Sequence, residues 1–216
     1  MGANFSLTSG DVTLRIVRMR DAKALESLVL GNREWLRPWE ATNPEAPQSF
    51  DFKAMVRGLL RQKDQQIGVP FAIEVDGQIV GQLNVANILY GAVSSAVIGY
   101  WIVPELDGQA IAGRGVAPTC VALCADYLMK TLGLHRVEIN IVPENSKSLR
   151  VVEKLGFRLE GLKQKYIHIN GAWRDHYIFA LTKEDFAGEP VGSNGVLARW
   201  NSGRVPLLDY PWITQK

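Results

Sequence analysis

The sequence predicts an α/β fold: one domain with a mixed, mostly antiparallel twisted sheet of about seven strands and flanking helices. Early segments alternate apolar and polar residues around turn signals, which is typical of hairpins. Later segments alternate strand, helix and strand, which favours a parallel pair. A hydrophobic content of 47% with 21% charged residues is ordinary for a globular chain. We expect residues 11–184 to form the domain and residues 185–216 a C-terminal tail of unknown role.

The first half of the chain predicts a strand, two helices and a set of hairpins. Alternation over Asp11–Arg18 indicates the first strand, and Asp21 is placed to cap the helix that follows. A loop rich in Trp and Pro leads to an amphipathic helix over residues 50–66. Asp76-Gly77, between two apolar runs, is the strongest hairpin signal in the chain. A further strand is expected over residues 96–103.

The second half predicts a long apolar helix from Val116, because its apolar residues recur with helical spacing. The stretch HRVEINIV indicates the next strand. A helix capped at Asn145 and closed by Gly156 should follow. The stretches YIHIN and WRDHYIFALT indicate a final strand pair.

Composition and charge narrow the classes of partner. A net charge of +2 gives no case for direct nucleic-acid binding. The segment Gly77–Pro104 has no charged residue and is long enough to span a bilayer, but its Gln, Asn and Gly residues favour buried strands. With no cleavable signal visible, we expect a cytoplasmic protein without membrane association. Cys120 and Cys124 lie one helical turn apart without further ligands nearby, which favours two core thiols over a metal site, and no metal is expected.

The stretch AGRGVAPT places Gly113 and Gly115 around Arg114, between a strand and a helix N-terminus. Unpaired amides and the helix dipole at such a junction favour an anion, and Arg114 adds a charge. A simple strand-to-helix turn is the alternative. The chain has no GxxxxGKS or GxxxxGKT, which excludes a P-loop, and it lacks the full GxGxxG of a dinucleotide site.

Three blocks with fixed spacing, GYWI, GRGVA and NSKS followed six residues later by LGF, resemble the GNAT N-acetyltransferases. Within that family they look most like the RimJ/RimL group, which acetylates protein N-termini. The resemblance covers about Val12–Leu181. The family's diphosphate motif, Q/R-x-x-G-x-G/A, falls on residues 112–117, with Ala112 in place of the usual Gln or Arg.

The resemblance implies acetyl-CoA as cosubstrate. Its pantetheine arm would pair with a strand edge that splays from its neighbour, formed by Tyr100, Trp101, Ile102 and Val103. Its diphosphate would lie on Gly113, Arg114, Gly115, Val116 and Ala117. Asn145 would bind the pantetheine, and Ser148 would protonate or stabilise the thiolate. A purely local role for these two residues, in the cap and first turn of their helix, is the alternative.

The general base is harder to assign. Some relatives place a glutamate in the strand after LGF, but the corresponding position here is about Ile167, so that role does not carry over. Glu138 is the best remaining carboxylate, with a salt bridge to His135 or Arg136 as the alternative. On the acceptor side, Trp35, Leu36 and Trp39 would form an apolar wall, unless the tryptophans simply cover the core.

We therefore expect an enzyme, an acetyltransferase in which an amine attacks the thioester directly. The leading acceptor is the N-terminal α-amine of a protein such as a ribosomal protein. Neutralising an α-amine at pH 7 costs only ~1 kcal/mol, against ~4.6 kcal/mol for a lysine, which suits a site without a strong base. Acetylation of a small amine, or a non-catalytic acyl-CoA-binding module, are the alternatives. We expect a monomer or weak homodimer.

Overall fold

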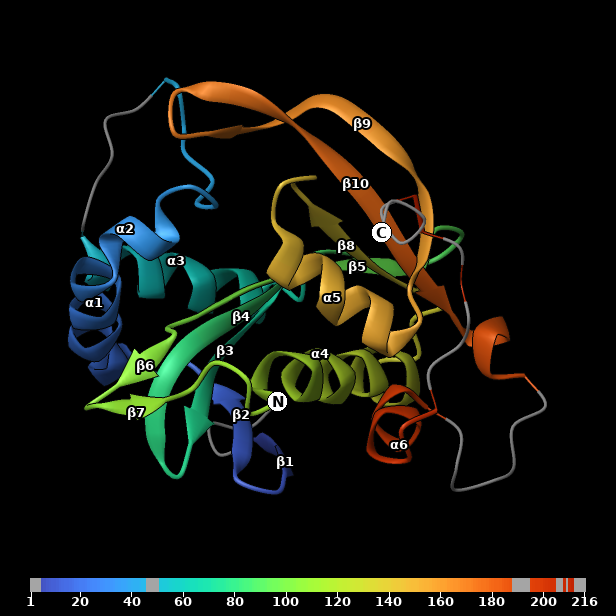
Figure 1. Cartoon of the computed structure of the whole chain (residues 1–216), viewed down its shortest axis with the longest axis horizontal. Helices are drawn as coiled ribbons and strands as arrows, with labels where there is room; N and C mark the ends of the chain where they lie inside the picture. Colours follow the sequence, from blue (N-terminus) through green and yellow to red (C-terminus); the bar gives the residue numbers. More distant parts are fainter. Residues whose placement is uncertain (1–4, 46–50, 188–194, 205–207, 209, 212–216) are drawn as a thin grey trace.

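A computed structural model describes residues 5–45, 51–187, 195–204, 208 and 210–211; the rest of the expected tail lies outside these residues. Eight strands form the main sheet: β1 Ser6–Ser9, β2 Val12–Ile16, β3 Val69–Val75, β4 Gln78–Leu89, β5 Ser95–Ile102, β8 Arg136–Ile141, β9 Arg158–Ile169 and β10 Ala172–Thr182. Their order is β1-β2-β3-β4-β5-β8-β10-β9 (Figure 1). A separate small hairpin is made by β6 Glu105–Leu106 and β7 Gln109–Ala110.

The expected mixed, mostly antiparallel sheet is confirmed, since β5 and β8 are parallel and the other neighbours antiparallel. The sheet has eight strands instead of about seven because Ser6–Ser9 pairs with β2, before the expected domain start at residue 11. At the other end, β10 continues the sheet to Thr182.

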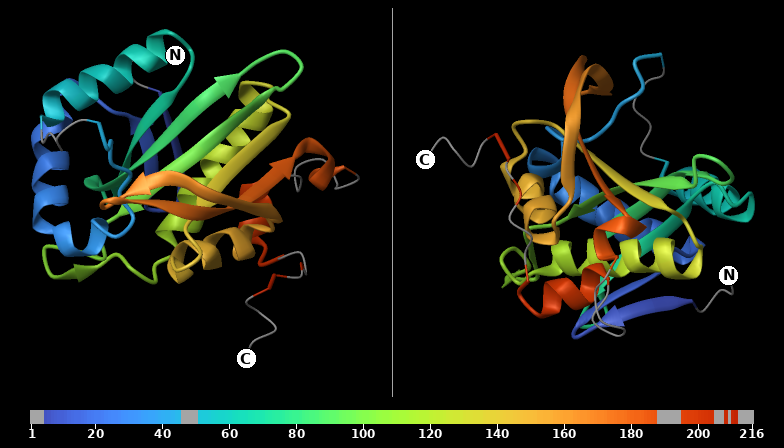
Figure 2. Two further views of the ribbon diagram at one scale, coloured as in Figure 1. Left: turned by 90° about the horizontal axis from the view of Figure 1, so that it is seen from above. Right: turned by 90° about the vertical axis from the view of Figure 1, so that its right-hand side faces the viewer.

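Six α-helices occur in the described residues: α1 Ala22–Gly31, α2 Arg33–Leu36, α3 Phe52–Asp64, α4 Val116–Asp126, α5 Ser146–Leu155 and α6 Val196–Asn201. Figure 2 shows α1 and α3 on one side of the sheet and α4 and α5 on the other. Among the described residues no helix is both long and apolar enough to cross a bilayer. The charge-free segment Gly77–Pro104 instead forms β4 and β5, in the middle of the sheet.

Helix α4 is buried on nearly every side, which explains why its sequence has no charged residue before Asp126. It lies between the sheet, α5 and α6 (Figure 1). Cys120 and Cys124 are free thiols inside this core, and burial raises the pKa of both. Their interpretation as reduced core thiols is confirmed.

The local signals at turns and helix ends were mostly reliable. Asp76 and Gly77 adopt φ of 51° and 80°, as the expected tight hairpin turn requires. Asn145 Oδ1 accepts from the Ser148 amide at 3.2 Å, so the cap of α5 is confirmed. Asp21 is different: its carboxylate does not cap α1 but accepts from the Arg18 amide at 2.7 Å and from Arg15 at 2.6 Å. The predicted cap is therefore wrong, because a nearby guanidinium competes for the carboxylate.

Candidate active site

Strands β5 and β8 pair only where Ser95–Val97 faces Arg136–Glu138, and beyond this point they diverge. The expected splay is therefore present. Between the diverging strands is a cavity of about 180 Å³. It is lined by Trp39, Ala41, Ile98, Gly99, Tyr100, Ile139, Asn140, Ile141, Val142, Asn145, Ser148, Ile167, Ile169 and His176.

The free edge of β5 exposes the peptide groups of alternate residues only. The Val103 amide donates to Val80 on β4 at 2.9 Å, so Val103 and Trp101 direct their peptide groups toward β4. The peptide groups of Tyr100 and Ile102 consequently point into the gap. The expectation that all four residues offer their backbone there is corrected for Trp101 and Val103, because hydrogen bonding alternates along a strand.

The glycine-rich loop ends in a helix N-terminus, as expected. Gly113 and Gly115 have φ of 87° and 77°, a left-handed conformation that favours glycine, and Gly115 is the N-cap of α4. Four amides of the described loop make no hydrogen bond to the backbone, those of Gly113, Gly115, Val116 and Ala117. Such a set of free amides at a helix N-terminus can hold an anion.

The Arg114 side chain has partners that the sequence did not indicate. Its guanidinium is ion-paired with Asp11 and with Asp76, the latter at 3.0 Å, and both hydrogen bonds raise the pKa of Arg114. Because two carboxylates already balance its charge, the loop would hold an anion mainly through backbone amides.

Two neighbouring hydroxyls, those of Tyr100 and Ser148, line the cavity. The Tyr100 hydroxyl is buried without a partner at hydrogen-bonding geometry. Burial raises the pKa of Tyr100 to about 12, and the nearby Ser148 hydroxyl opposes this shift. Both groups are therefore neutral at pH 7 and can donate a proton or a hydrogen bond.

His176 is the one histidine among the residues that line the cavity, and it is only 4% exposed. Its Nδ1 lies 3.0 Å from the Arg174 carbonyl oxygen, which only accepts, so Nδ1 carries the proton and Nε2 a lone pair. Burial lowers the pKa of His176 below its ordinary 6.5. The imidazole is therefore a neutral base at pH 7. Sequence reasoning assigned no catalytic role to His176, because a histidine within a strand matches no motif.

Glu138 lies in an ion-pair cluster and not along the cavity. Its carboxylate accepts from Arg136 Nε at 2.6 Å, and Arg136 also binds Glu160, with Nη1 and Oε1 2.9 Å apart. These bonds raise the pKa of Arg136 and lower that of Glu160. The structure thus favours the alternative interpretation of Glu138, a salt bridge, and we do not assign it as the base.

The three residues expected on the acceptor side take different positions. Trp39 is partly exposed and lines the cavity. Leu36 is instead buried in a cluster with α1 and α3, so its expected place in the acceptor wall is corrected. Trp35 lies between these regions: Nε1 donates to the Ile102 carbonyl at 3.2 Å, and Lys147 Nζ lies 3.6 Å from its ring centroid.

The segment after Trp39 contacts the far end of the β9–β10 hairpin. Ala41 forms a bridge with Ile169, and the Thr42 amide donates to the His168 carbonyl at 2.9 Å. In Figure 1 the hairpin arches over the molecule toward this segment. The part of the cavity lined by Trp39 and Ala41 is thus enclosed by two parts of the chain far apart in sequence.

Comparison with known proteins agrees with this architecture. Residues 11–158 match the family model described as acetyltransferase (GNAT) domain. The [ribosomal protein uS5]-alanine N-acetyltransferase of Escherichia coli is 30% identical over 187 residues, covering 83% of this chain and 92% of that protein. The chain therefore belongs to the GNAT acetyltransferase family, and it is an acyltransferase.

Solved structures show the same similarity. Mycobacterium smegmatis RimJ in complex with CoA-disulfide matches with a TM-score of 0.79 and 32% identity, covering 94% of this chain and 96% of that one. The ribosomal-protein-S5-alanine acetyltransferase of Vibrio fischeri matches with a TM-score of 0.74 and 26% identity, covering 84% and 98%.

Proposed function

We propose that the chain transfers the acetyl group of acetyl-CoA to the N-terminal α-amine of a protein, with a ribosomal protein as the leading candidate. The observation that carries this proposal is the cavity between β5 and β8, which Trp39, Ser148 and His176 line, in a chain that also has a loop of free amides at the N-terminus of α4. The names of the Escherichia coli and Vibrio fischeri relatives support the class of acceptor.

On the donor side, the diphosphate would bind the free amides of the Gly113–Ala117 loop. The pantetheine would pair with the peptide groups of Tyr100 and with the carbonyl of Ile98, which point from β5 into the gap; the Ile98 amide already takes part in the last β5–β8 pair. Ile102 is not included, because its carbonyl already accepts from Trp35. Asn145 Oδ1 is held by the Ser148 amide, which leaves its amide nitrogen to donate to the pantetheine.

At the thioester, the neutral α-amine would attack the carbonyl carbon from the side of Trp39. As the carbon–nitrogen bond forms, the amine proton would pass to His176 Nε2, directly or through one water. The carbon–sulfur bond then breaks, and Ser148 or Tyr100 would supply the proton for the leaving thiolate. A base with a lowered pKa suits an α-amine, because that amine is already partly neutral at pH 7.

The lining of the cavity argues against a polyamine as acceptor. None of its residues is acidic. A multiply charged amine entering it would lose water without a carboxylate partner, which is costly. An α-amine that arrives neutral avoids this cost.

Thiol release from acetyl-CoA with two matched peptides tests the proposal. One peptide has a free Ala or Ser N-terminus and no lysine; the other has a blocked N-terminus and one internal lysine. Turnover with only the first is expected. Turnover with only the second, or with neither while acetyl-CoA binds, would overturn the assignment of the acceptor.

A further inference from the structure

The C-terminal tail contributes a tryptophan to the neighbourhood of the glycine loop. Trp200, on α6, donates from Nε1 to Thr119 Oγ1 at 3.0 Å, in the first turns of α4. A Cβ built on Gly115 would lie 3.3 Å from Trp200 Cζ2. The indole therefore lies directly against the loop whose amides are free.

The tail is held in this place by several contacts. The Val196 amide donates to Asp126 at 2.8 Å, at the opposite end of α4 from the loop. Arg199 Nη2 donates to the Asp185 carbonyl at 2.8 Å, and the Tyr210 hydroxyl donates to the Phe157 carbonyl. The position of Trp200 is thus fixed by an anchored segment.

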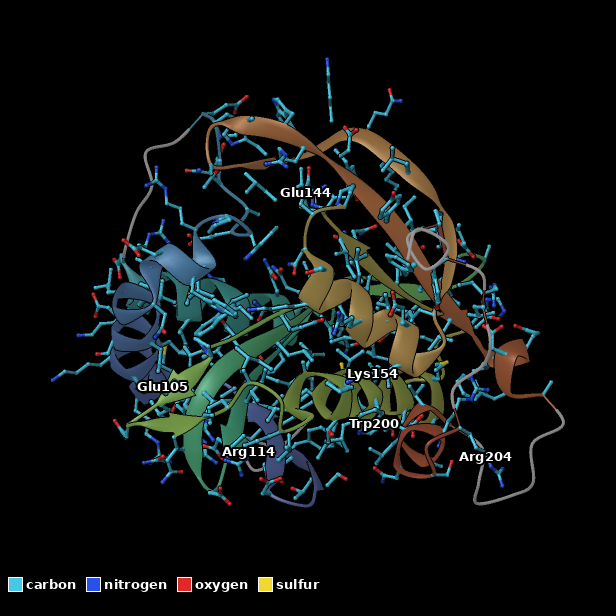
Figure 3. All side chains as sticks on the ribbon, viewed as in Figure 1. Glu105, Arg114, Glu144, Lys154, Trp200 and Arg204 are labelled. Atoms are coloured by element: carbon cyan, nitrogen blue, oxygen red, sulfur yellow. The ribbon has the colours of Figure 1, made fainter. Side chains whose placement is uncertain are left out.

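Two basic residues of α5 share the helix face that carries Lys154. Arg150 and Lys154 are four residues apart, which puts them on one face of the helix, and both are exposed. Lys154 Nζ lies 5.8 Å from the Trp200 ring centroid, and Figure 3 shows the two side chains next to each other. Among the described residues, neither Arg150 nor Lys154 takes part in an ion pair.

We propose that Trp200, Arg150 and Lys154 form the subsite for the adenosine 3′-phosphate of coenzyme A. The inference rests on the proposed donor site, since the adenosine follows directly after the diphosphate and must lie next to the Gly113–Ala117 loop. A planar purine can stack on an indole face, and such stacking strengthens binding of a base without regard to sequence. The 3′-phosphate dianion matches the unpaired cations of α5. The C-terminal tail is then part of the donor site.

Calorimetric binding of two ligands, coenzyme A and 4′-phosphopantetheine, tests the subsite, because only the first carries the adenosine 3′-phosphate. Trp200→Leu should weaken coenzyme A about tenfold and leave 4′-phosphopantetheine within about twofold. Trp200→Phe keeps a ring but loses the bond to Thr119, and it should retain most of the preference for coenzyme A. Trp173→Leu, an exposed tryptophan on β10, is the matched control and should change neither affinity.

The cations are tested with coenzyme A and 3′-dephospho-coenzyme A. The double change Arg150→Gln and Lys154→Gln should reduce the preference for coenzyme A by about fivefold to tenfold. Lys23→Gln, an exposed lysine on α1, is the charge-matched control.

The proposal is overturned if Trp200→Leu weakens both ligands equally, which would make the indole only a support for the loop. It is also overturned if both Trp200→Leu and the double variant of Arg150 and Lys154 keep the ligand preferences of the unchanged protein. These measurements need no acceptor. A failure of peptide acetylation with intact ligand preferences would therefore refute the proposed function and leave the subsite standing.

Discussion

The indole nitrogen of Trp35 donates to the carbonyl oxygen of Ile102 at 3.2 Å, across the free edge of β5. This bond joins the helix before the acceptor segment to the strand expected to hold the pantetheine. Lys147, next to Ser148 on α5, lies over the same ring. Trp35 therefore joins α2 to β5 and to α5.

Trp35→Phe keeps most of the ring and removes the donor. We expect a loss of about 0.5–1.5 kcal/mol in the free energy of unfolding. Acetyl-CoA affinity should stay within about twofold, because the pantetheine is assigned to Ile98 and Tyr100. Chemical denaturation and calorimetry measure the two quantities. A clearly tighter binding of acetyl-CoA would show that the indole competes with the pantetheine for Ile102.

Ser148→Ala removes a hydroxyl next to the expected thiolate. We expect kcat to fall about tenfold or more, with nearly unchanged acetyl-CoA affinity, because a positioned proton donor acts mainly in the transition state. The cap of α5 should survive, since Asn145 binds the Ser148 amide and not its hydroxyl. Tyr100→Phe is the comparison variant. If only Tyr100→Phe slows turnover, the proton comes from the phenol.

Gly113→Ala tests the loop without a steric clash, because a Cβ there meets nothing within 4 Å. With φ at 87°, alanine is strained by roughly 1–2 kcal/mol, and relief of that strain would turn the free amides away from the ligand. We expect coenzyme A affinity to fall about tenfold. Gly171→Ala, at φ 89° in the β9–β10 turn and equally unobstructed, is the matched control. Equal affinity in both variants would place the diphosphate elsewhere.

The lowered pKa of His176 predicts a pH dependence of two kinds. An unfolded histidine binds a proton below about pH 6.5 while the buried one does not, so stability should decrease as the pH falls below that value. For activity, a plot of log kcat/KM against pH should have a slope of one below about pH 7.7–8.0, because the α-amine becomes protonated there. Protonation of His176 should add a second unit of slope below the pKa of His176.

His176→Asn should remove the second unit of slope and lower kcat, and peptide kinetics from pH 5.5 to 8.5 measure both effects. A kcat for His176→Asn that stays within about twofold of the unchanged protein would exclude His176 as the base.

Glu138→Gln separates the two interpretations of this residue. Since Glu138 pairs with Arg136 at a partly exposed position, we expect a loss of about 0–1 kcal/mol in stability and kcat/KM within about twofold. Thermal melting and peptide kinetics provide the readout. A loss of activity of about a hundredfold would restore Glu138 as the general base.

Local signals in the sequence predicted most of the elements. The Asp76-Gly77 turn, the Asn145 cap and the glycine loop each depend on residues within one turn of the chain, so the chemistry of those residues was sufficient. The pattern RVEINI also alternates strictly, which places Arg136 and Glu138 on one face of β8. This alternation already favoured their salt bridge.

Contacts between distant segments could not be predicted in the same way. Arg114 binds two turns far along the chain, Trp200 reaches Gly115 from the tail, and Trp35 binds Ile102. Each depends on which elements the fold brings together, and no local pattern encodes that. The role proposed for His176 was missed for the same reason, because it depends on the splay of two other strands.

The ion pairs of Arg114 have a consequence for local unfolding. Asp11 lies in the β1–β2 turn and Asp76 in the β3–β4 turn, so one side chain ties both turns to the loop before α4. Opening of either turn should loosen that loop, and a ligand on the loop should in return hold both turns closed. Backbone amides near Asp11 and Gly77 would then exchange their hydrogens more slowly when a ligand is bound at the loop.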